Sequence, residues 1–377
     1  MPVAEIRLVG LRHRYGDSED ALKGVDLTWE DGGAYALLGP SGCGKTTMLN
    51  IISGLLTPTE GQVLFDGVDV TRKTTVERNI AQVFQFPVLY DSMTVEENMC
   101  FPLRNRGISK RDAQVRAAEI AELLEIGHLL TSRARGLSAD AKQLVSLSRA
   151  LVRRDVSAIL FDEPLTVIDP QKKWTLRQAL KRVHTELNHT LVYVTHDQTE
   201  ALTFADTVVV MDQGHVVQKG TPDELFERPA HTFVGNFIGS PGMNFLACAV
   251  HDGVVGIAGV ALIRLPSSVS PEHETGDVVG IRPDFVRFVP SGAAADDHAA
   301  TVAGSVLDVR DLGTSHLVSV EVDGSPLMAK VPPGAHVPAP GPARVVLAPE
   351  QLHFFRGGQR VDGTAGTSTP QHAGSGR

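Results

Sequence analysis

The stretch Gly39-Pro40-Ser41-Gly42-Cys43-Gly44-Lys45-Thr46 decides the fold of this chain, because it matches the phosphate-loop pattern G-x-x-x-x-G-K-[ST]. A short apolar run precedes it at residues 36–38, and a helical pattern follows at residues 47–52. Glycines let backbone N–H groups point at a phosphate, and the helix adds the positive end of its dipole. Lys45 offers a charge to the β- and γ-phosphates, and Thr46 offers a hydroxyl to Mg²⁺. The alternative is an ordinary glycine-rich turn. The probability that such a turn matches the pattern by chance somewhere in this chain is on the order of one per cent, so the stretch predicts nucleotide binding.

The composition of the chain indicates a multidomain globular protein. Its 377 residues, 42% hydrophobic and 21% charged, suffice for two or three domains with separate cores. A net charge of −9 argues against non-specific binding of nucleic acid, although it does not exclude a local basic patch. No run approaches about 18 apolar residues and no signal-peptide pattern occurs, so we expect a cytoplasmic chain that crosses no membrane alone. Three widely spaced cysteines predict neither a disulfide framework nor a metal site.

Alternating strand and helix patterns predict an α/β core with a largely parallel sheet. Strand patterns lie at residues 6–8, 61–65, 158–161, 191–194 and 208–211, and Asp66-Gly67 is a hairpin signal. Helical spacing lies at residues 110–126, where Val115 and Ile120 are among the expected apolar positions, and at residues 138–152 and 174–187. Residues from about 88 to 155 are therefore predicted to form an inserted helical subdomain.

Helical periodicity disappears from about residue 245 onward. Short β-rich pieces separated by Gly, Pro, Asp and Ser follow, which predicts a small all-β barrel of the OB type. Residues 290–300 have the composition of a flexible loop. Residues 357–377 are rich in Gly, Thr, Ser and Gln, and we expect a disordered tail there.

Four further positions carry candidate chemistry. Asp162 and Glu163 end an apolar strand pattern that we expect beside the phosphate-loop strand, which places Asp162 near Mg²⁺ and lets Glu163 polarise a water as general base. His196 ends the next strand and can reach a γ-phosphate. Gln85 follows a strand that leaves the core, and its amide can bridge Mg²⁺ and water. Taken singly, the acidic pair is as often a solvated turn, and the histidine and the glutamine are weak signals.

Tyr15 precedes the phosphate loop and can stack on adenine, although an isolated tyrosine more often serves packing. Cys43 lies beside Lys45 at a helix N-terminus, a position that lowers the pKa of a thiol. The alternative for Cys43 is a small residue that fills space.

Together these motifs resemble the ATP-binding subunits of ABC transporters over residues 1–240. The similar motifs are the A-loop aromatic (Tyr15), Walker A (Gly39 to Thr46), the Q-loop (Gln85), the start of the signature (Leu137-Ser138), Walker B (residues 158–163), the D-loop aspartate (Asp169) and the switch histidine (His196). The resemblance implies an ABC ATPase core that binds ATP and Mg²⁺. The resemblance implies that Glu163, His196 and Gln85 are catalytic. It implies that Thr46, Gln85 and Asp162 contact the metal. It also implies that the nucleotide contacts Tyr15, residues 39–46, Thr47, Ser138 and Asp169.

Residues 241–356, with Gly280-Ile281-Arg282-Pro283, resemble the accessory barrel of carbohydrate-type importers. Residues 161–170, 188–190 and 237–243 are similar to ATPase subunits of glycerol or related polyol importers. The resemblance implies an ATP-hydrolysing subunit that energises import of a carbohydrate or polyol, such as glycerol or glycerol-3-phosphate. It would lie peripherally on the cytoplasmic face of the inner membrane. Its partners would be permease subunits and a second ATPase subunit, in a homodimer or a heterodimer, with a solute-binding protein as an indirect partner and no nucleic acid.

The signature departs from the family pattern L-S-G-G-Q and reads Leu137-Ser138-Ala139-Asp140-Ala141. In the family, each ATP lies between one subunit's Walker A and the other subunit's signature. A carboxylate about 6 Å from a γ-phosphate costs roughly 3 kcal/mol at an effective dielectric of about 20. Asp140 is therefore either a large handicap or a first-turn helix acid that turns aside while Lys142 offsets its charge.

The D-loop, Thr166-Val167-Ile168-Asp169-Pro170, is also less polar than the family pattern. We therefore hypothesise that the chain pairs with a different ATPase subunit whose signature is intact. Two other roles stay open. One is a soluble ABC-type ATPase acting on ribosomes or DNA, which the single cassette, the acidic charge and the lack of heptads disfavour. The other is a mainly regulatory subunit whose barrel senses a ligand.

Overall fold

The computed structural model describes residues 4–187, 189–290, 300–362 and 364–365. The chain divides into two compact units, Met1–Pro222 and Asp223–Arg377. The helices α8 (Pro222–Glu227) and α9 (Thr232–Phe237) therefore lie almost entirely in the second unit, although the expected ATPase domain extended to residue 240. Asn188, residues 291–299 of the expected loop and residues 366–377 of the expected tail lie outside the described residues.

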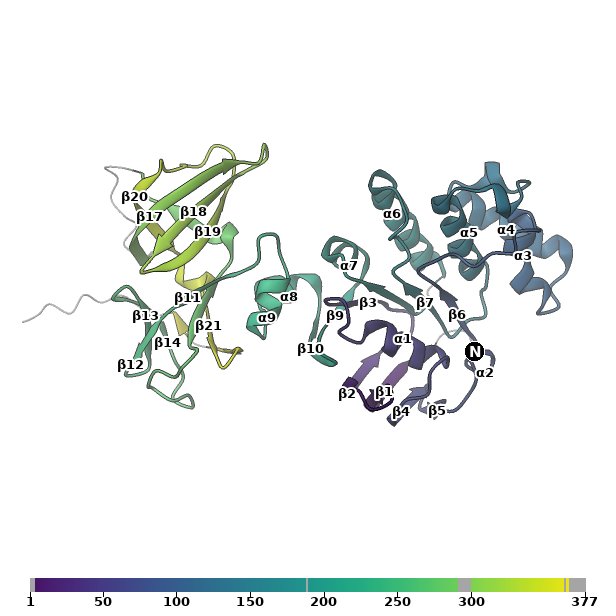
Figure 1. The fold of residues 1–377 in the computed structure, drawn as a ribbon, viewed down its shortest axis with the longest axis horizontal. Coiled ribbons are helices and arrows are strands. Elements are labelled where there is room, and N and C mark those ends of the chain that lie inside the picture. The colour runs from purple at the N-terminus through teal and green to yellow at the C-terminus, as the bar shows by residue number, and fades with distance from the viewer. Residues whose placement is uncertain (1–3, 188, 291–299, 363, 366–377) are drawn as a thin grey trace, which may run out of the picture. The chain divides into compact units, whose positions relative to one another are not determined.

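A six-stranded sheet forms the centre of the first unit (Figure 1). Its strand order is β10-β9-β3-β8-β7-β6, and all neighbours except β9 and β10 pair in parallel. The strand that ends in the acidic pair, β7, does not lie beside the phosphate-loop strand β3 as the sequence predicted, because β8 pairs with both and separates them. The bounds are β3 Ala34–Leu38, β6 Ile80–Val83, β7 Ala158–Asp162, β8 Leu191–Thr195, β9 Thr207–Asp212 and β10 His215–Gly220.

A second, antiparallel sheet of this unit has the order β2-β1-β4-β5. Asp66 and Gly67 both have positive φ, 50° and 75°, and they form the predicted turn between β4 and β5. The helix α1, which follows the phosphate loop, shares one hydrophobic core with strands of both sheets. The bounds are β1 Ile6–Arg14, β2 Asp20–Trp29, β4 Glu60–Phe65, β5 Val68–Asp69 and α1 Lys45–Ser53.

Helices between residues 88 and 155 form the predicted helical subdomain; α2 precedes it, and α6 and α7 follow it in the core. The apolar face of α4 includes Ile120, which is 2% exposed, whereas Val115 is 55% exposed and lies off that face. The subdomain helices are α3 Val95–Arg104, α4 Lys110–Leu123, η1 Gly127–Leu129, η2 Ala134–Gly136 and α5 Ala139–Leu151; the others are α2 Thr75–Arg78, α6 Pro170–Leu187 and α7 Gln198–Phe204.

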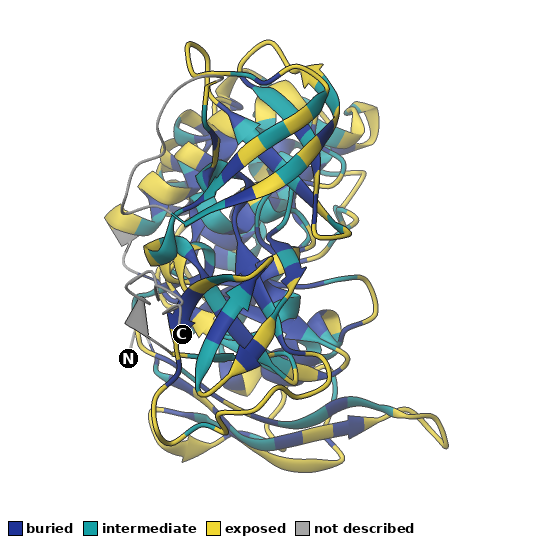
Figure 2. Cartoon of the chain, turned by 90° about the vertical axis from the view of Figure 1, so that its left-hand side faces the viewer, coloured by how far each residue is buried: buried dark blue, intermediate teal, exposed yellow. Residues whose placement is uncertain are grey.

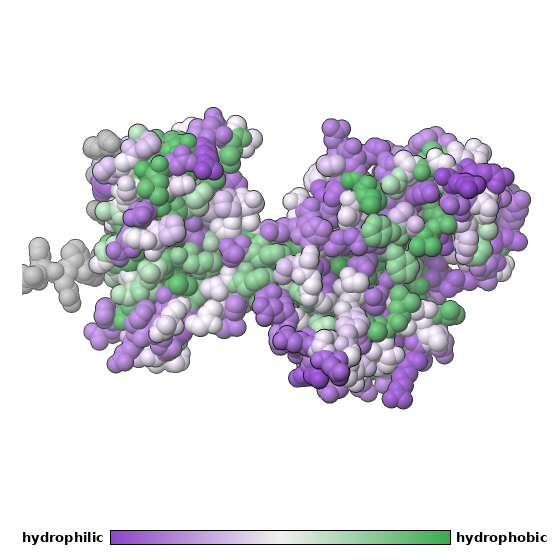
Figure 3. All heavy atoms as spheres, in the orientation of Figure 1, coloured by the Kyte–Doolittle hydropathy of each residue, from purple (hydrophilic) through white to green (hydrophobic). Residues whose placement is uncertain are grey.

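Apolar side chains are exposed directly after β6. Phe84 and Tyr90 are each 42% exposed, Phe86 is 69% exposed and Val88 is 66% exposed. Figure 3 shows hydrophobic side chains on the visible face of this unit, among hydrophilic ones. None of the helices in the described part of the chain is long and apolar enough to cross a membrane.

Most of the second unit is the predicted all-β OB-type domain, which follows α8 and α9 and has one core shared by its sheets. Along β18 and β19, buried residues alternate with residues that are partly or fully exposed (Figure 2). The three sheets have the orders β11-β15-β21-β22, β12-β13-β14-β23 and β16-β20-β17-β18-β19. The bounds are β11 Asn244–Ala247, β12 Ala249–His251, β13 Val254–Ile257, β14 Val260–Arg264, β15 Val278–Ile281, η3 Pro283–Phe285, β16 Val286–Phe288, β17 Ala300–Asp311, β18 His316–Val322, β19 Ser325–Val331, β20 Gly341–Leu347, η4 Pro349–Gln351, β21 His353–Arg356, β22 Gln359–Val361 and β23 Thr364–Ala365.

The expected disordered tail is wrong at its start. Gly357 and Gly358 both have positive φ, 56° and 82°, and turn the chain so that β22 pairs with β21. Two consecutive glycines after a strand are a hairpin signal, and the polar composition of the residues that follow concealed it.

Two buried arginines anchor helix ends through backbone carbonyls, and neither forms an ion pair with an acidic side chain among the described residues. Arg78 is 2% exposed and donates to the carbonyls of Ile51 and Ile52 at the end of α1, at 2.6 and 2.9 Å, and to those of Thr71 and Lys73. Arg282 is 1% exposed and donates to carbonyls of residues 225, 226, 235 and 238 around α8 and α9. Each guanidinium satisfies carbonyls that a helix leaves unpaired.

We predict that Arg78→Met lowers the free energy of unfolding of the first unit by about 3 kcal/mol, because four carbonyls lose their donor in a site closed to water. Urea unfolding followed through the fluorescence of Trp29, which is fully buried in the same unit, measures the change. Arg72→Met is the matched control, since Arg72 is exposed. Equal stability of the two variants would contradict the anchoring role.

Candidate nucleotide-binding site

The parallel register of four strands brings the candidate residues to one edge of the sheet. Leu38 pairs with Thr195, Asp162 with Val194, and Val83 with Phe161. The strands β3, β8, β7 and β6 therefore end at the same level. The phosphate loop, His196, Glu163 and Gln85 follow these ends, as ligand-binding residues do in open α/β sheets.

The phosphate loop is held in a shape that only glycine permits at two positions. A Cβ at Gly39 would lie 2.3 Å from the Met211 carbonyl oxygen. Gly44 has a φ of 101°, and a Cβ there would lie 2.5 Å from the Ala21 carbonyl oxygen. Lys45, 6% exposed, donates from Nζ to the carbonyls of Gly39 and Pro40 at 2.8 and 2.9 Å. The loop thus wraps around its own ammonium group, which gives it a positive centre.

Thr46 and Asp162 form an oxygen pair suited to a small divalent cation. Thr46 Oγ1 donates to Asp162 Oδ1 at 3.2 Å, and burial raises the pKa of the Asp162 carboxyl. The described residues contain no group of three or more His, Cys, Asp or Glu that could hold a metal by themselves. A site with one carboxylate and one hydroxyl fits Mg²⁺, which takes its other oxygens from phosphates and water. These residues therefore fit the metal that the sequence predicted.

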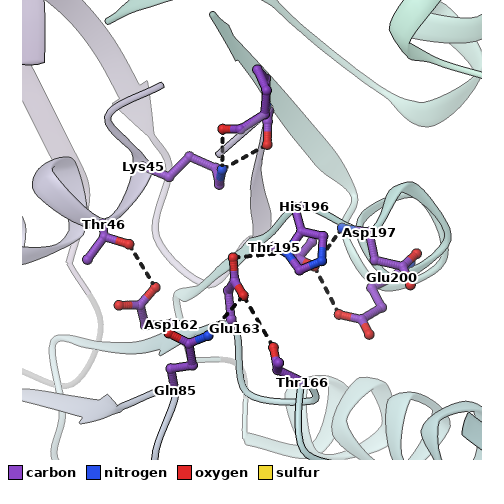
Figure 4. Close-up of polar contacts among 12 residues, drawn as sticks. Lys45, Thr46, Gln85, Asp162, Glu163, Thr166, Thr195, His196, Asp197 and Glu200 are labelled. Atoms are coloured by element: carbon purple, nitrogen blue, oxygen red, sulfur yellow. Dashed lines mark hydrogen bonds and ion pairs between the residues drawn. The ribbon is translucent and has the colours of Figure 1, made fainter. Parts of the chain in front are cut away.

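Glu163 lies at the centre of the polar cluster drawn in Figure 4. Its Oε1 is 3.0 Å from His196 Nδ1, and its Oε2 accepts from Gln85 Nε2 at 3.4 Å and from Thr166 Oγ1 at 3.2 Å. The backbone of Glu163 has a φ of 46°, and its N–H donates to the Val194 carbonyl at 2.9 Å. The structure thus brings Gln85, Glu163 and His196 together, and pairs Gln85 with Glu163.

A second network, which the sequence did not indicate, positions the turn that carries His196. Glu200, 3% exposed, accepts from Tyr193 Oη at 2.9 Å, from Thr195 Oγ1 at 3.0 Å and from Lys173 Nζ at 3.0 Å. Asp197 caps α7 by accepting from the Glu200 N–H. The sequence offered no recognisable signal for these five polar residues, because they come from α6, β8, and α7 with its N-cap and meet only around Glu200.

Tyr15 lies beside the start of α1, as an adenine-stacking residue requires. Its hydroxyl is 3.2 Å from Thr47 Oγ1, and its ring contacts the His13 ring edge-on with centroids 4.6 Å apart. Half of the Tyr15 surface is exposed. The ring is therefore accessible for a base to stack on it.

The signature residues do not join this cluster. Ser138 is the N-cap of α5 and donates to Asp140, whose other oxygen pairs with Lys172 Nζ at 2.9 Å. The counter-ion of Asp140 is thus Lys172, and the expectation that Lys142 offsets it is wrong, because Lys142 pairs with Asp91 at 3.6 Å. Asp169 Oδ1 accepts from the Gln171 N–H at 2.9 Å, at the start of α6.

The expected lowering of the Cys43 pKa is wrong. Cys43 is 3% exposed, and burial raises the pKa of its thiol despite the Lys45 ammonium 3.8 Å from its sulfur. Desolvation of the thiolate outweighs the attraction to that charge. The alternative from the sequence holds: Cys43 fills space under the loop.

Because one edge of a parallel sheet carries both a phosphate loop and an acidic pair, the first unit is a P-loop nucleoside triphosphatase. Residues 22–166 match the ABC transporter family, and residues 279–355 match the TOBE domain. The sn-glycerol-3-phosphate import ATP-binding protein UgpC of Chromohalobacter salexigens is 41% identical, over 85% of each chain. The sulfoquinovosyl glycerol transport ATP-binding protein SmoE of Agrobacterium fabrum is 38% identical, over 94% of this chain and 98% of its own length.

Solved structures of ABC ATPases resemble the first unit. The cbiO1 protein of Clostridium perfringens, part of the ABC transporter complex cbiONQ, has a TM-score of 0.55 and 28% identity over 59% of this chain and 90% of that chain. A dimeric ATP-binding cassette, MJ0796 bound to ADP and Pi, has a TM-score of 0.52 and 31% identity over 58% of this chain and 98% of that chain. The chain therefore belongs to the ABC transporter family, as an ATP-binding subunit.

We predict that Cys43 resists alkylation in the folded protein at neutral pH, because a raised pKa leaves little thiolate and the thiol is covered. Mass spectrometry after iodoacetamide treatment should find Cys43 unmodified in native protein and modified in urea. Rapid native modification that ATP prevents would contradict the raised pKa.

Proposed function

We propose that the chain hydrolyses ATP, with Glu163 as the general base. The proposal rests on the contacts of the Glu163 carboxylate with His196, Gln85 and Thr166. A carboxylate held by three neighbours at a strand end can orient a water for attack on a γ-phosphate. His196 donates a hydrogen bond to the phosphate, and Lys45 balances its charge. Mg²⁺, held by Thr46 and Asp162 with Gln85 nearby, would neutralise the phosphate oxygens.

We further propose that Gln85 links nucleotide to the transport path. Its amide contacts Glu163, and the chain that follows exposes Phe86 and Val88 at the start of the helical subdomain. A group of exposed apolar side chains favours a protein partner. The proposed partners are integral-membrane permease subunits, which would hold this subunit on the cytoplasmic face of the inner membrane, with a solute-binding protein contributing indirectly.

The proposed solute is an anionic glycerol derivative. UgpC is named for sn-glycerol-3-phosphate and SmoE for sulfoquinovosyl glycerol, and both names contain a glycerol unit and an anionic group. The assignment rests on these relatives, since the solute need not touch the ATPase. Residues 1–240 are proposed as the ATPase domain and residues 241–356 as the accessory barrel.

We also propose that the chain works with a second, different ATPase subunit. The signature carries Asp140 where the family has glycine, and this carboxylate forms an ion pair with Lys172. The partner would supply an intact signature to the nucleotide held by Lys45 and Glu163. The reciprocal site would bind ATP and turn it over slowly.

We predict that Glu163→Gln lowers ATP turnover by the assembled transporter about 10²–10³-fold and leaves ATP binding intact, because only the base is removed. Lys45→Ala should instead lower MgATP affinity, since it removes the charge at the phosphates. Phosphate release and isothermal titration with MgATP measure the two effects. Normal turnover by Glu163→Gln would contradict the assignment of the base.

We predict that cells lacking this chain lose uptake of radiolabelled sn-glycerol-3-phosphate. The wild-type chain should restore uptake, and the Lys45→Ala chain, expressed at the same level, should not. Unchanged uptake in the deletion strain would exclude this solute and leave the ATPase assignment standing.

A further inference from the structure

The signature serine is already satisfied within its own subunit. Ser138 Oγ accepts from the Ala141 N–H at 3.4 Å as the N-cap of α5, and it donates its proton to Asp140 Oδ1. A serine hydroxyl has a single proton to donate. While Ser138 donates to Asp140, it cannot donate to a phosphate of a nucleotide bound by another subunit.

The Asp140 carboxylate is fixed by a cation from a different helix. Its Oδ2 accepts from Lys172 Nζ at 2.9 Å, so each carboxylate oxygen has its own donor. The hydrogen bond from Ser138 and the one from Lys172 lower the Asp140 pKa to about 2, so the group is charged at neutral pH. The ion pair also joins α5 of the helical subdomain to α6 of the core.

We propose that Asp140 acts as a built-in substitute for the γ-phosphate: it occupies the Ser138 hydroxyl at the N-terminus of α5, so that this signature cannot contact the γ-phosphate of an ATP held by a partner's phosphate loop. Lys172 is the positioning residue that holds the carboxylate there. The partner that fits is an ATPase subunit with a glycine signature, because it can complete the site of Lys45 and Glu163 without needing this one in return. The inference rests on the proposed pairing of unlike subunits and adds its physical cause.

The test uses the full chain and Glu163→Gln, which stalls hydrolysis and should preserve an ATP-bound dimer. With MgATP, the Glu163→Gln protein should stay monomeric in light scattering, because both signatures of a homodimer are capped. Adding Ala139→Gly and Asp140→Gly should tighten self-association about tenfold or more. An unbalanced carboxylate about 6 Å from a γ-phosphate would weaken association about a hundredfold, and the Lys172 charge offsets part of this loss.

Two controls separate the carboxylate from other changes. Ala139→Gly alone removes the Cβ and keeps the charge, and Asp91→Gly removes an equal charge from the helical subdomain. Neither should produce the dimer. Dimerisation of the Glu163→Gln protein with its natural signature, or full dimerisation by Ala139→Gly alone, would overturn the inference. Failure of the monomer to bind MgATP in titration calorimetry would instead count against the proposed function.

A separate measurement tests Lys172. Lys172→Met should raise the Asp140 pKa from about 2 toward its ordinary value of 3.8, as followed by carboxyl ¹³C chemical shifts during titration. Lys173→Met is the neighbouring control, because Lys173 pairs with Glu200. An unchanged Asp140 pKa in Lys172→Met would show that Lys172 does not hold this carboxylate.

Discussion

The parallel pairing of β8 with both β3 and β7 is the constraint on which the site depends. It sets the ends of three strands at one level, so that Thr46 reaches Asp162 at 3.2 Å across the width of an intervening strand. The same strand carries His196 at its end, between the phosphate loop and the acidic pair. The strand β8 thus sets the spacing between the phosphate loop and the acidic pair, and it also carries the histidine that contacts Glu163.

Glu163 shows how this site stores and offsets local strain. A φ of 46° is costly for a residue with a side chain, of the order of 1–2 kcal/mol. The hydrogen bond from its N–H to Val194 holds the backbone, and the contacts of its carboxylate with Gln85, Thr166 and His196 hold the side chain. The strained turn and these contacts together set the direction in which the carboxylate points at the sheet edge.

In each unit, a buried arginine donates to backbone carbonyls and forms no ion pair within the described part of the chain. Arg78 ties the end of α1 to the adjoining segment, and Arg282 ties α8 and α9 to the barrel, in each case through backbone carbonyls. Burial lowers the pKa of both groups, that of Arg282 to about 10, so they remain charged at neutral pH. Asp140 is handled differently, since its charge is balanced by an ion pair that joins two helices. Arg78, Arg282 and Asp140 therefore each connect a helix to another part of the chain.

The linear order of residues determined the phosphate loop, the acidic strand end of Asp162 and Glu163, the helical insertion and the β-rich domain in the second unit, because each depends on local spacing of glycines, charges and apolar side chains. Only the tertiary structure decided that β8 separates β3 from β7, that Lys172 and not Lys142 balances Asp140, and that burial raises the Cys43 pKa. The physical reason is that strand order, ion-pair choice and desolvation are set by groups distant in the chain, which meet only when the core packs.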